Sequence, residues 1–519
     1  MSESATTLVI LGLAVLAFIS GRIPTGIVAL GVALALAATG ILELPQAFAG
    51  FADPSVVLIA ALFVVAEGLD ASGLTAWTGR LLVRRGGGNP VVLTVFVMLV
   101  VALLSALITP NGAVAALLPV VVVIARRIEV PPALLLLPLA FGAHAGALLT
   151  LTGSPVNVIV SEFAADAAGH GFGFFEFTIV GAPLLVGSIL IAALFGRRLI
   201  PARSPATMSR DLTEHPSVLL REYPAAASAE VDREAGVAEV LVAPRSGLIG
   251  ERVFPGMVTD SGELVIVAVS RGGEQLPAGE VVLRAGDVLL LQGSWDALDR
   301  NVVDPDVLVV DAPDAVRRQA APLGWRAGVA IAILAAMVVL LATGLLPPAV
   351  TGLLAAIAMV LTGVVPVTRA HRAISWSTIL LVAGMIPMST AITETGTAAT
   401  IATALVDALG SAGPTVVLLA LCVVALIFGQ LISNTATVLI LAPISVSVAT
   451  TLGLSPLPFL MGVGVVCAAA FLTPVATPAN FMVKDPAGLR FGDYWKLGLP
   501  LMALFLAVAV LLVPLVWPF

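Results

Sequence analysis

Long apolar stretches limit what this chain can fold into more than any other feature of its sequence. Of its 519 residues, 59% are hydrophobic and only 11% are charged, and the mean hydropathy is +1.10. A soluble domain carries about 25% charged residues. Because about 20 consecutive apolar residues in a helix cross the hydrocarbon core of a bilayer, the sequence predicts an all-α, polytopic membrane protein.

The charged residues are concentrated in the middle of the chain. Residues 200–322 hold 11 of the 25 Lys and Arg residues and 19 of the 32 Asp and Glu residues, so this segment carries −8 and the remainder +1. The composition predicts a soluble insert at 200–322 between two membrane segments, 1–199 and 323–519. Cys422 and Cys467 both lie in apolar runs, so neither a disulfide framework nor a metal cluster is indicated.

Three pairs of short motifs recur at one spacing. "TPNG" at 109–112 pairs with "ISNT" at 432–435, "TGSPVN" at 152–157 with "VATPAN" at 475–480, and "DASG" at 70–73 with "TETG" at 393–396. The partners are 323 residues apart in every pair. A single offset across separated motifs predicts that 1–199 and 323–519 are copies of one unit.

Each copy is expected to cross the membrane five times. The expected spans are 6–21, 24–42, 54–78, 131–165 and 177–196 in the first copy, and 325–345, 349–365, 375–402, 455–490 and 494–517 in the second. The segments 90–127 and 413–451 are interpreted as re-entrant hairpins, which enter and leave on one side. An odd number of crossings makes the second copy an inverted repeat of the first.

Basic residues indicate the orientation, because Lys and Arg favour cytoplasmic loops. With both termini outside, the predicted inner loops contain every basic residue that lies outside the insert: Arg22, Arg80, Arg84, Arg85, Arg126, Arg127, Arg197, Arg198, Arg326, Arg369, Arg372, Lys484, Arg490 and Lys496. The predicted outer loops contain no Lys or Arg. The sequence therefore predicts a protein of the cell (inner) membrane with a cytoplasmic insert.

The paired motifs interrupt apolar runs with proline, glycine and polar side chains. Non-helical backbone at membrane depth is tolerated only where it lines a cavity or is buried in protein. The ends of broken helices offer N–H groups to an anion, while freed carbonyls and Ser, Thr and Asn oxygens are suitable ligands for sodium. Discontinuous helices at matching positions of inverted repeats point to the binding site of a transporter.

The motifs resemble those of the divalent anion:sodium symporters, within the wider ion transporter superfamily. The resemblance is carried by "SNTAT" at 433–437, "TPAN" at 477–480 and "TGSPVN" at 152–157. The cation-binding residues it implies are Ser433, Asn434 and Ala476 at the second hairpin, and Thr109, Asn111 and Gly153 at the first. The substrate-binding residues it implies are Asn111, Gly112, Ser154, Pro155, Asn157, Asn434, Thr435, Thr477, Pro478 and Asn480.

The first hairpin tip departs from the pattern of that family. The family has Ser-Asn-Thr at both tips, but here Pro110 and Gly112 flank Asn111. Thr109 supplies a hydroxyl displaced by one residue. Three alternatives follow for the first cation site: it is weaker, it is absent, or it is replaced by proton coupling.

Glu67, Asp70, His144 and Glu394 are ionisable residues within the predicted spans. Ionisable groups inside a membrane are costly and usually functional, so they are candidates for proton coupling. Structural roles remain open as alternatives. The acids are close to Gly68, Gly73 and Gly396, where a helix can end near water, and a buried histidine can serve packing.

The insert contains short stretches in which apolar and polar residues alternate, a pattern typical of strands. Residues 237–305, with "RAGDVLLLQG" at 284–293, resemble the RCK C-terminal domain found beside potassium transporters. The resemblance implies a small α/β domain that binds a regulatory ligand or dimerises. The membrane scaffold is expected to form a homodimer by the same kind of analogy.

The sequence thus predicts a secondary active transporter, which carries a small divalent anion such as a dicarboxylate or sulfate together with sodium by alternating access. One alternative is a sodium/proton antiporter or oxyanion exporter of the same superfamily. Another is a ligand-regulated ion channel or sensor. No catalytic constellation indicates an enzyme, no nucleic-acid partner is expected, and sodium ions or protons are the only cofactors implied.

Overall fold

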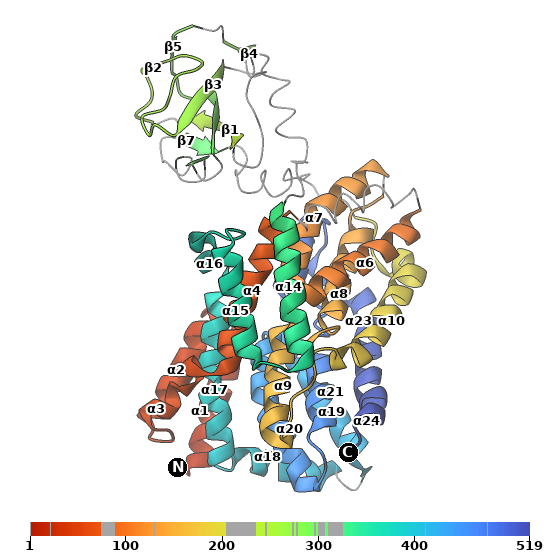
Figure 1. The fold of residues 1–519 in the computed structure, drawn as a ribbon. Helices are drawn as coiled ribbons and strands as arrows, with labels where there is room; N and C mark the ends of the chain where they lie inside the picture. The colour runs from red at the N-terminus through yellow and green to blue at the C-terminus, as the bar shows by residue number, and fades with distance from the viewer. Residues whose placement is uncertain are drawn as a thin grey trace. The chain divides into compact units, whose positions relative to one another are not determined.

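The computed structural model divides into two compact units, Met1–Met208 with Trp325–Phe519 and Ser209–Gly324. It describes residues 2–20, 22–73, 89–128, 130–203, 235–243, 246–271, 274–276, 279–294, 297–298, 301, 307–309, 325–409, 412–474 and 476–519. The predicted inner-loop residues Arg80, Arg84 and Arg85 lie outside the described residues. The first unit, called the membrane unit below, is helical (Figure 1).

The first half of the membrane unit contains the helices α1 (Glu3–Ser20), α2 (Thr25–Ala38), α3 (Leu44–Ala47), η1 (Ala49–Ala52), α4 (Pro54–Ala71), α6 (Pro90–Leu107), α7 (Pro110–Arg127), α8 (Ala133–Ala147), η2 (Leu151–Gly153), α9 (Pro155–Ala168) and α10 (Glu176–Leu199). The second half contains α14 (Trp325–Thr343), α15 (Pro348–Leu361), α16 (Val367–Ala373), α17 (Trp376–Glu394), α18 (Thr397–Leu409), α19 (Pro414–Leu431), α20 (Asn434–Leu452), α21 (Leu457–Cys467), α22 (Pro478–Lys484), η5 (Phe491–Asp493), α23 (Trp495–Ala507), η6 (Val508–Leu512) and α24 (Val513–Val516).

Nine helices among the described residues are long and apolar enough to cross a membrane, and six shorter apolar helices accompany them. The prediction of a multi-pass helical membrane protein is therefore confirmed. One predicted span was wrong in its extent. Residues 375–402 form two helices, because α17 ends at Glu394 and Gly396 adopts a left-handed conformation (φ +69°), which glycine accepts readily, before α18 begins.

Several helices begin where the sequence provides a starting signal. Asp53 accepts a hydrogen bond from the Ser55 N–H at the start of α4 (2.8 Å), and Asn89 does so from the Val91 N–H at the start of α6 (3.0 Å). A proline follows each of these two caps. Proline suits the first helical position because its missing N–H would have no partner there.

The first helices of the two halves, α1 and α14, begin at opposite ends of the membrane unit (Figure 1). In Figure 1, α1 begins at the end where both chain termini lie, whereas α14 begins at the opposite end. The α6–α7 pair lies toward that opposite end, and the α19–α20 pair toward the end with the termini. At 18 residues, α6 and α19 are long enough to cross a bilayer alone, so re-entrance stays a prediction.

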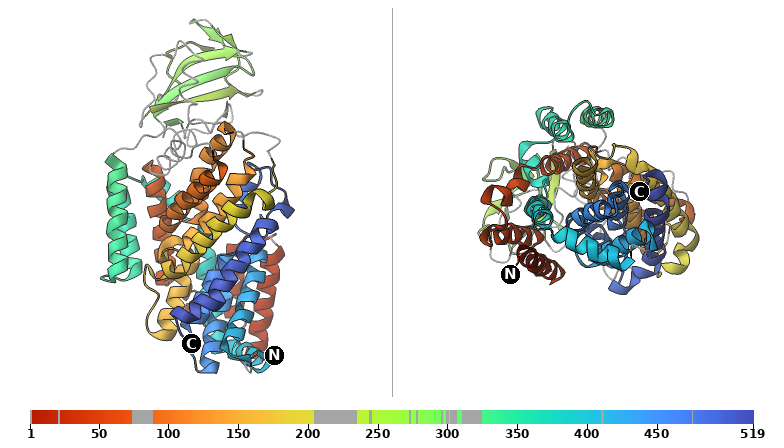
Figure 2. Two further views of the ribbon diagram at one scale, coloured as in Figure 1. Left: turned by 90° about the vertical axis from the view of Figure 1, so that its right-hand side faces the viewer. Right: turned by 90° about the horizontal axis from the view of Figure 1, so that it is seen from below.

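Helices of one half pack closely against helices of the other. α2 contacts α17, and α4 contacts α15. Close approach depends on glycine at both crossings: a Cβ on Gly384 would lie 2.9 Å from the Ala29 Cβ, and one on Gly352 would lie 2.6 Å from the Leu58 Cδ1. α14 and α15 lie side by side at the periphery of the unit (Figure 2).

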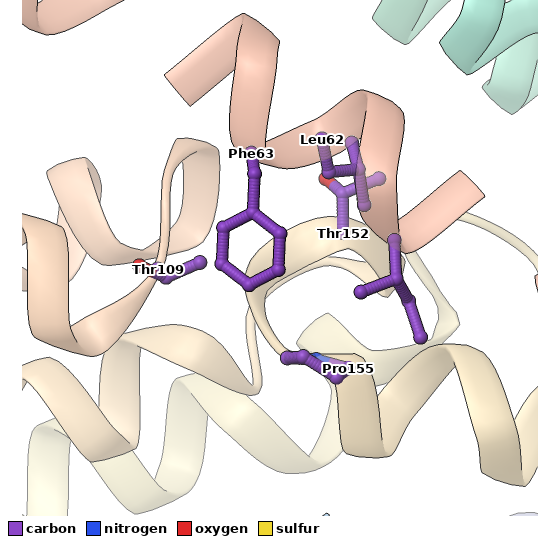
Figure 3. A pocket seen from close by; sticks show the side chains of 6 residues that line it. Leu62, Phe63, Thr109, Thr152 and Pro155 are labelled. Atoms are coloured by element: carbon purple, nitrogen blue, oxygen red, sulfur yellow. The ribbon is translucent and has the colours of Figure 1, made fainter. Parts of the chain in front are cut away.

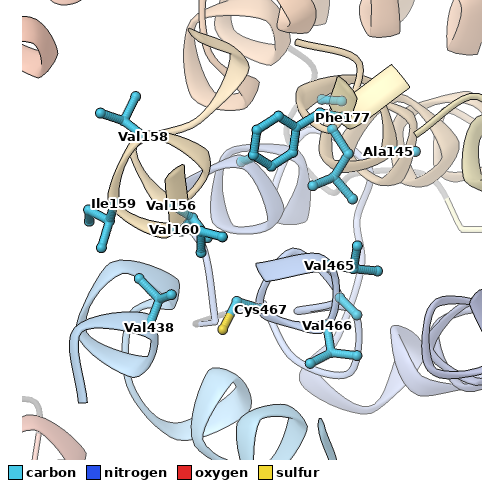
Figure 4. Close-up of a cluster of buried hydrophobic side chains, with 14 of the residues drawn as sticks. Ala145, Val156, Val158, Ile159, Val160, Phe177, Val438, Val465, Val466 and Cys467 are labelled. Carbon is cyan, nitrogen blue, oxygen red and sulfur yellow. The ribbon is translucent and has the colours of Figure 1, made fainter. Parts of the chain in front are cut away.

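The interior beside the helix breaks is a continuous apolar core. α9 of the first half packs against α20 and α21 of the second half. Val156, Val158 and Val160 are buried there together with Val438 and other apolar side chains (Figure 4). Since burial of such side chains stabilises by about 1.5–3 kcal/mol each, this core holds α9 firmly against the other half.

The second unit contains β1 (Ala235–Val242), β2 (Arg252–Val253), β3 (Leu264–Arg271), β4 (Glu274–Gln275), β5 (Val281–Val282), β6 (Val288–Ser294) and β7 (Val307–Val309). Five of these strands form a sheet in the order β4-β3-β6-β1-β7, and β2 pairs with β5. All the pairs are antiparallel, and Val240 lies opposite Leu289 in the β1–β6 pair. The strands predicted in the insert are thus present.

An ion pair between half-buried Arg271 and buried Asp287 links the end of β3 to the residue before β6. Arg271 Nε lies 2.7 Å from Asp287 Oδ1, and the Asp287 side chain is 1% exposed. The hydrogen bonds from the Arg271 guanidinium hold the pKa of the Asp287 carboxyl below its usual value, despite its burial. A depressed pKa means that the pair stabilises the fold above pH 4, about the pKa of an unfolded Asp, and less as the pH falls below that value.

We expect Gly146→Ala to lower the stability of the membrane unit. A Cβ on Gly146 would lie 2.3 Å from the Ala102 Cα, at the crossing of α8 and α6, and overpacking of this kind costs about 1–3 kcal/mol. Thermal unfolding of the detergent-solubilised protein measures the effect. Gly12→Ala is the control, because nothing lies within 4 Å of its Cβ; equal melting temperatures for both variants would contradict the packing argument.

Asp287→Ala is expected to weaken the sheet of the insert at neutral pH, since it removes the carboxylate that accepts hydrogen bonds from the Arg271 guanidinium and from the Arg284 N–H. Faster hydrogen exchange in β3 and β6 of the full chain would reveal it. Glu280→Ala is the control, because the Arg252–Glu280 pair is exposed (75% and 66% of the side chains). Unchanged exchange in Asp287→Ala would show that the Arg271–Asp287 pair does not hold the sheet.

Candidate functional site

Two helices begin directly after the hairpin tips, and a hydroxyl caps each of them. Thr109 Oγ1 accepts a hydrogen bond from the Gly112 N–H at the start of α7 (3.2 Å). Ser433 Oγ accepts one from the Ala436 N–H at the start of α20 (3.2 Å). A hydroxyl that caps a helix satisfies one of the N–H groups left free in the first turn. The predicted tip residues therefore have a structural role in the helix starts.

Two asparagines stabilise the loops that break the second helix of each half. Asn157 Nδ2 donates to the carbonyl oxygens of Ala147 and Thr150, both at 2.8 Å. Asn480 Nδ2 donates to those of Ala470 (2.7 Å) and Thr473 (3.1 Å). The acceptors lie ten and seven residues before the asparagine in both halves. These amides replace the helical hydrogen bonds that the carbonyls lose at the breaks.

Side chains from the first half bind the loop of the second half. The Ala479 N–H donates to Asn111 Oδ1 (3.1 Å), and His144 Nε2 lies 3.1 Å from Thr477 Oγ1. Thr477 Oγ1 also accepts from the Asn480 N–H (3.3 Å). The structure thus brings the first tip, the intramembrane histidine and the "TPAN" loop together.

Buried oxygen atoms without a hydrogen-bond partner gather on the same segments. Among the described residues these include Asn157 Oδ1, Asn434 Oδ1 and Thr473 Oγ1. A buried polar atom left unpaired costs about 1–3 kcal/mol, so such atoms usually mark a place where another group binds. Neutral side-chain oxygens of this kind are suitable ligands for a hard cation.

A small pocket lies on the first-half side of the breaks. Its lining combines the predicted residues Thr109, Thr152 and Pro155 with Ile59, Leu62 and Phe63 of α4 (Figure 3). Sequence reasoning did not identify the α4 residues, because an apolar side chain that lines a pocket looks like any other in an apolar helix.

The remaining predicted residues have varied positions. Gly153 is buried, and a Cβ there would lie 2.3 Å from the Ala147 carbonyl oxygen, so the loop requires glycine. Ser154 Oγ accepts from the Val156 N–H (3.2 Å). Thr435 is half-buried in the first turn of α20, and Ala476 is buried just before α22. Gly112 and Pro478 belong to the first turns of α7 and α22.

The four proton-coupling candidates occupy different places. His144 is 3% exposed and contacts Thr477. Glu67 and Asp70 are half-buried on α4, where each interacts with a neighbouring group. Glu394 is exposed at the end of α17, and Gln46 Nε2 donates to its Oε1 (3.4 Å). Of the four, His144 lies at the helix breaks, because it contacts Thr477.

Two polar residues that sequence reasoning missed also support the second loop. The Tyr494 hydroxyl donates to the Asn480 carbonyl oxygen (2.8 Å). Gln430 accepts from the Leu472 N–H (3.0 Å) and donates to the Ala469 carbonyl oxygen (3.1 Å). The only available signal was Gln430 itself, a polar residue three positions before Ser433 in an apolar helix.

Comparison with known proteins identifies relatives along the whole chain. Residues 15–453 and 411–519 match the sequence profile of the CitMHS family, described as citrate transporter. An uncharacterized transporter, YfbS, from Escherichia coli is 31% identical over 100% of both chains. The profile includes the region of the insert, and no match to an RCK domain accompanies it, so the RCK resemblance stays a prediction.

Shorter matches involve relatives with a named substrate. A protein named probable sodium/sulfate cotransporter 3, from Chlamydomonas reinhardtii, is 26% identical over 52% of this chain and 31% of its own. The Na(+)/dicarboxylate cotransporter 3 of Rattus norvegicus is 32% identical over 25% of this chain and 22% of its own. All these relatives are named as transporters and not as enzymes.

Asn480→Asp is expected to destabilise the membrane unit, since the carboxylate cannot donate to the two carbonyls that Asn480 binds. Each buried acceptor left unpaired costs about 1–3 kcal/mol. Asn89→Asp is a matched control, because Asn89 acts as an acceptor at a helix start and Asp caps about as well as Asn, within about 0.5 kcal/mol. Thermal unfolding of both proteins compares them; an equal loss would show that the donor role of Asn480 does not matter.

Proposed function

Because the chain belongs to the citrate transporter family, we propose that it is a secondary active transporter that carries a small divalent anion together with sodium. The observation that carries this proposal is the set of buried, unpaired oxygens at paired helix breaks. Relatives named sodium/sulfate and Na(+)/dicarboxylate cotransporters support sodium as the coupling ion and a dicarboxylate or sulfate as the substrate.

The two halves are proposed to be inverted repeats. The offset of 323 residues relates α2 to α15 at both ends, Thr25 to Pro348 and Ala38 to Leu361. Two contacts between the halves are related by the same offset. Ala29 lies close to Gly384, and Ala61 lies close to Gly352. By the offset, Ala29 corresponds to Gly352 and Ala61 to Gly384, so each contact is the counterpart of the other. Reciprocal pairs of this kind are what a two-fold axis in the membrane plane produces.

The cation is proposed to bind at the second tip. Ser433, Asn434 and the backbone at Ala476 are the ligands, and Asn434 Oδ1 supports this role because it is buried and unpaired. The anion would bind between the two tips. The residues proposed to face it are Gly112, Ser154, Pro155, Asn157, Thr435, Thr477, Pro478 and Asn480.

Alternating access is proposed to move the broken helices against a scaffold of α1, α2, α14 and α15. The peripheral position of α14 and α15 supports this division (Figure 2). The insert is proposed to be cytoplasmic, because Arg197 and Arg198 end α10 and Arg326 begins α14. That orientation places both termini outside. Homodimerisation and binding of a small ligand by the insert stay predictions.

A proton-coupled carrier, such as a sodium/proton antiporter or an oxyanion exporter, is the second candidate. The contact between His144 and Thr477 favours it, because it places an ionisable side chain at the helix breaks, and ionisable groups inside a membrane are usually functional. Such a carrier would follow pH more than sodium. A dependence of uptake on sodium at constant pH separates the two candidates.

Asn434→Ala is expected to raise the sodium concentration for half-maximal uptake by tenfold or more, because a cation ligand is lost, whereas the loss of one neutral hydrogen bond accounts for about fivefold. Uptake of radiolabelled sulfate and succinate into proteoliposomes, with sodium varied against choline, measures this. Asn89→Ala removes an asparagine that caps α6 and should leave the sodium dependence unchanged. Transport that is equal without sodium in the unsubstituted protein would refute sodium coupling.

A further inference from the structure

The two halves hold their broken loops by different hydrogen bonds, although their motifs correspond. In the first half the Val156 N–H donates to Ser154 Oγ, two residues before it (3.2 Å). In the second half the corresponding hydroxyl, Thr477 Oγ1, accepts instead from the Asn480 N–H, three residues after it (3.3 Å). The Ala479 N–H, which corresponds to that of Val156, therefore needs another acceptor.

The first hairpin tip supplies that acceptor. The Ala479 N–H donates to Asn111 Oδ1 (3.1 Å). Asn434 occupies the corresponding position of the second tip, but the N–H that would pair with it is already bound to Ser154. Asn434 Oδ1 is buried without a partner among the described residues. Asn111 Oδ1 thus accepts a hydrogen bond from the loop of the other half, whereas Asn434 Oδ1 has no partner among the described residues.

His144 provides a physical reason for this difference. Its Nε2 lies 3.1 Å from Thr477 Oγ1, and its ring packs edge-on against Phe471 with centroids 5.9 Å apart. The corresponding residue of the second half is Cys467, whose thiol is a weak hydrogen-bonding group. A threonine side chain has few preferred rotamers. The imidazole can therefore favour the rotamer in which Thr477 Oγ1 accepts from the Asn480 N–H over one in which it accepts from the Ala479 N–H.

We propose that His144 is a positioning residue that makes the two tips unequal. His144 orients the Thr477 hydroxyl away from the Ala479 N–H. That N–H then donates to Asn111 Oδ1, so this oxygen is not available to bind a cation. The protein then binds one coupling cation, at Asn434. This inference rests on the proposed sodium-coupled transport and adds to it the number of coupling ions.

Equilibrium binding of radiolabelled sodium to the purified full chain tests the number directly. We expect one ion per chain, its loss in Asn434→Ala, and its retention in Asn111→Ala with an affinity within about twofold, while the maximal uptake rate of Asn111→Ala falls by about fivefold with its hydrogen bond. Two ions per chain, of which Asn111→Ala loses one, would overturn the inference and leave sodium-coupled transport intact.

Variants of His144 test its positioning role. His144→Gln retains a donor and should keep one sodium ion. His144→Cys copies the second half, so Thr477 can turn to the Ala479 N–H and release Asn111. We expect a second bound sodium ion in that variant, with the Hill coefficient of uptake rising from about 1 toward about 2, the number of sites. A folded His144→Cys protein that still binds one ion would overturn the role of His144.

A double-mutant cycle keeps the test independent of sodium. His144→Met and Asn111→Ala act on one chain of hydrogen bonds, so their effects on the melting temperature should be non-additive. Additive effects would overturn the link between the two residues. If the unsubstituted protein binds no sodium, the proposed coupling ion is wrong, and the cycle still decides whether His144 and Asn111 act together.

Thr25→Val is the control for loss of a hydrogen bond between the halves. Thr25 Oγ1 lies 3.2 Å from Ser377 Oγ, on α2 and α17 and outside the broken loops. We expect this variant to bind one sodium ion with unchanged affinity. A loss of sodium binding equal to that of Asn434→Ala would show that the assay reports general stability, and it would remove the support for a site at Asn434.

Discussion

Every backbone polar group inside a bilayer needs a partner within the protein, and the arrangement of this membrane unit depends on that constraint. The chain breaks two helices where lipid offers no hydrogen bonds. Asn157 and Asn480 resolve the conflict, since each donates from one amide to two carbonyls near the break. The breaks can therefore persist in an apolar core. The unpaired side-chain oxygens near them, such as Asn157 Oδ1 and Asn434 Oδ1, are the atoms proposed above to face the anion or the cation.

The core around the breaks has contributions from both halves. α9 packs on α20 and α21, while α22 packs on α7 and α8, so the loops of each half are held by helices of the other. An aromatic cluster extends this contact, with the rings of Phe141 and Phe471 at 4.8 Å and those of Phe471 and Phe505 at 5.0 Å. A movement of one loop would therefore displace residues of both halves.

Equal motifs do not produce equal sites. Asn111 and Asn434 are 323 residues apart and begin corresponding helices, yet one oxygen accepts a hydrogen bond and the other has no partner among the described residues. The difference arises from which N–H group the neighbouring hydroxyl accepts, at Ser154 or at Thr477. The proposed positioning role of His144, which stands where the second half has Cys467, accounts for this difference.

The sequence by itself determined the multi-pass helical class, the acidic insert with its strands and the places where helices break, because hydropathy, charge and helix-breaking residues act over a few neighbouring positions. Only the tertiary structure decided that Asn111 and His144 meet the loop at 477–480, that Phe63 of α4 lines the pocket beside Thr109, and that α17 ends at Glu394. These facts depend on contacts between residues that are far apart in the sequence, or on the conformation of a single residue. A local sequence pattern carries no information about either.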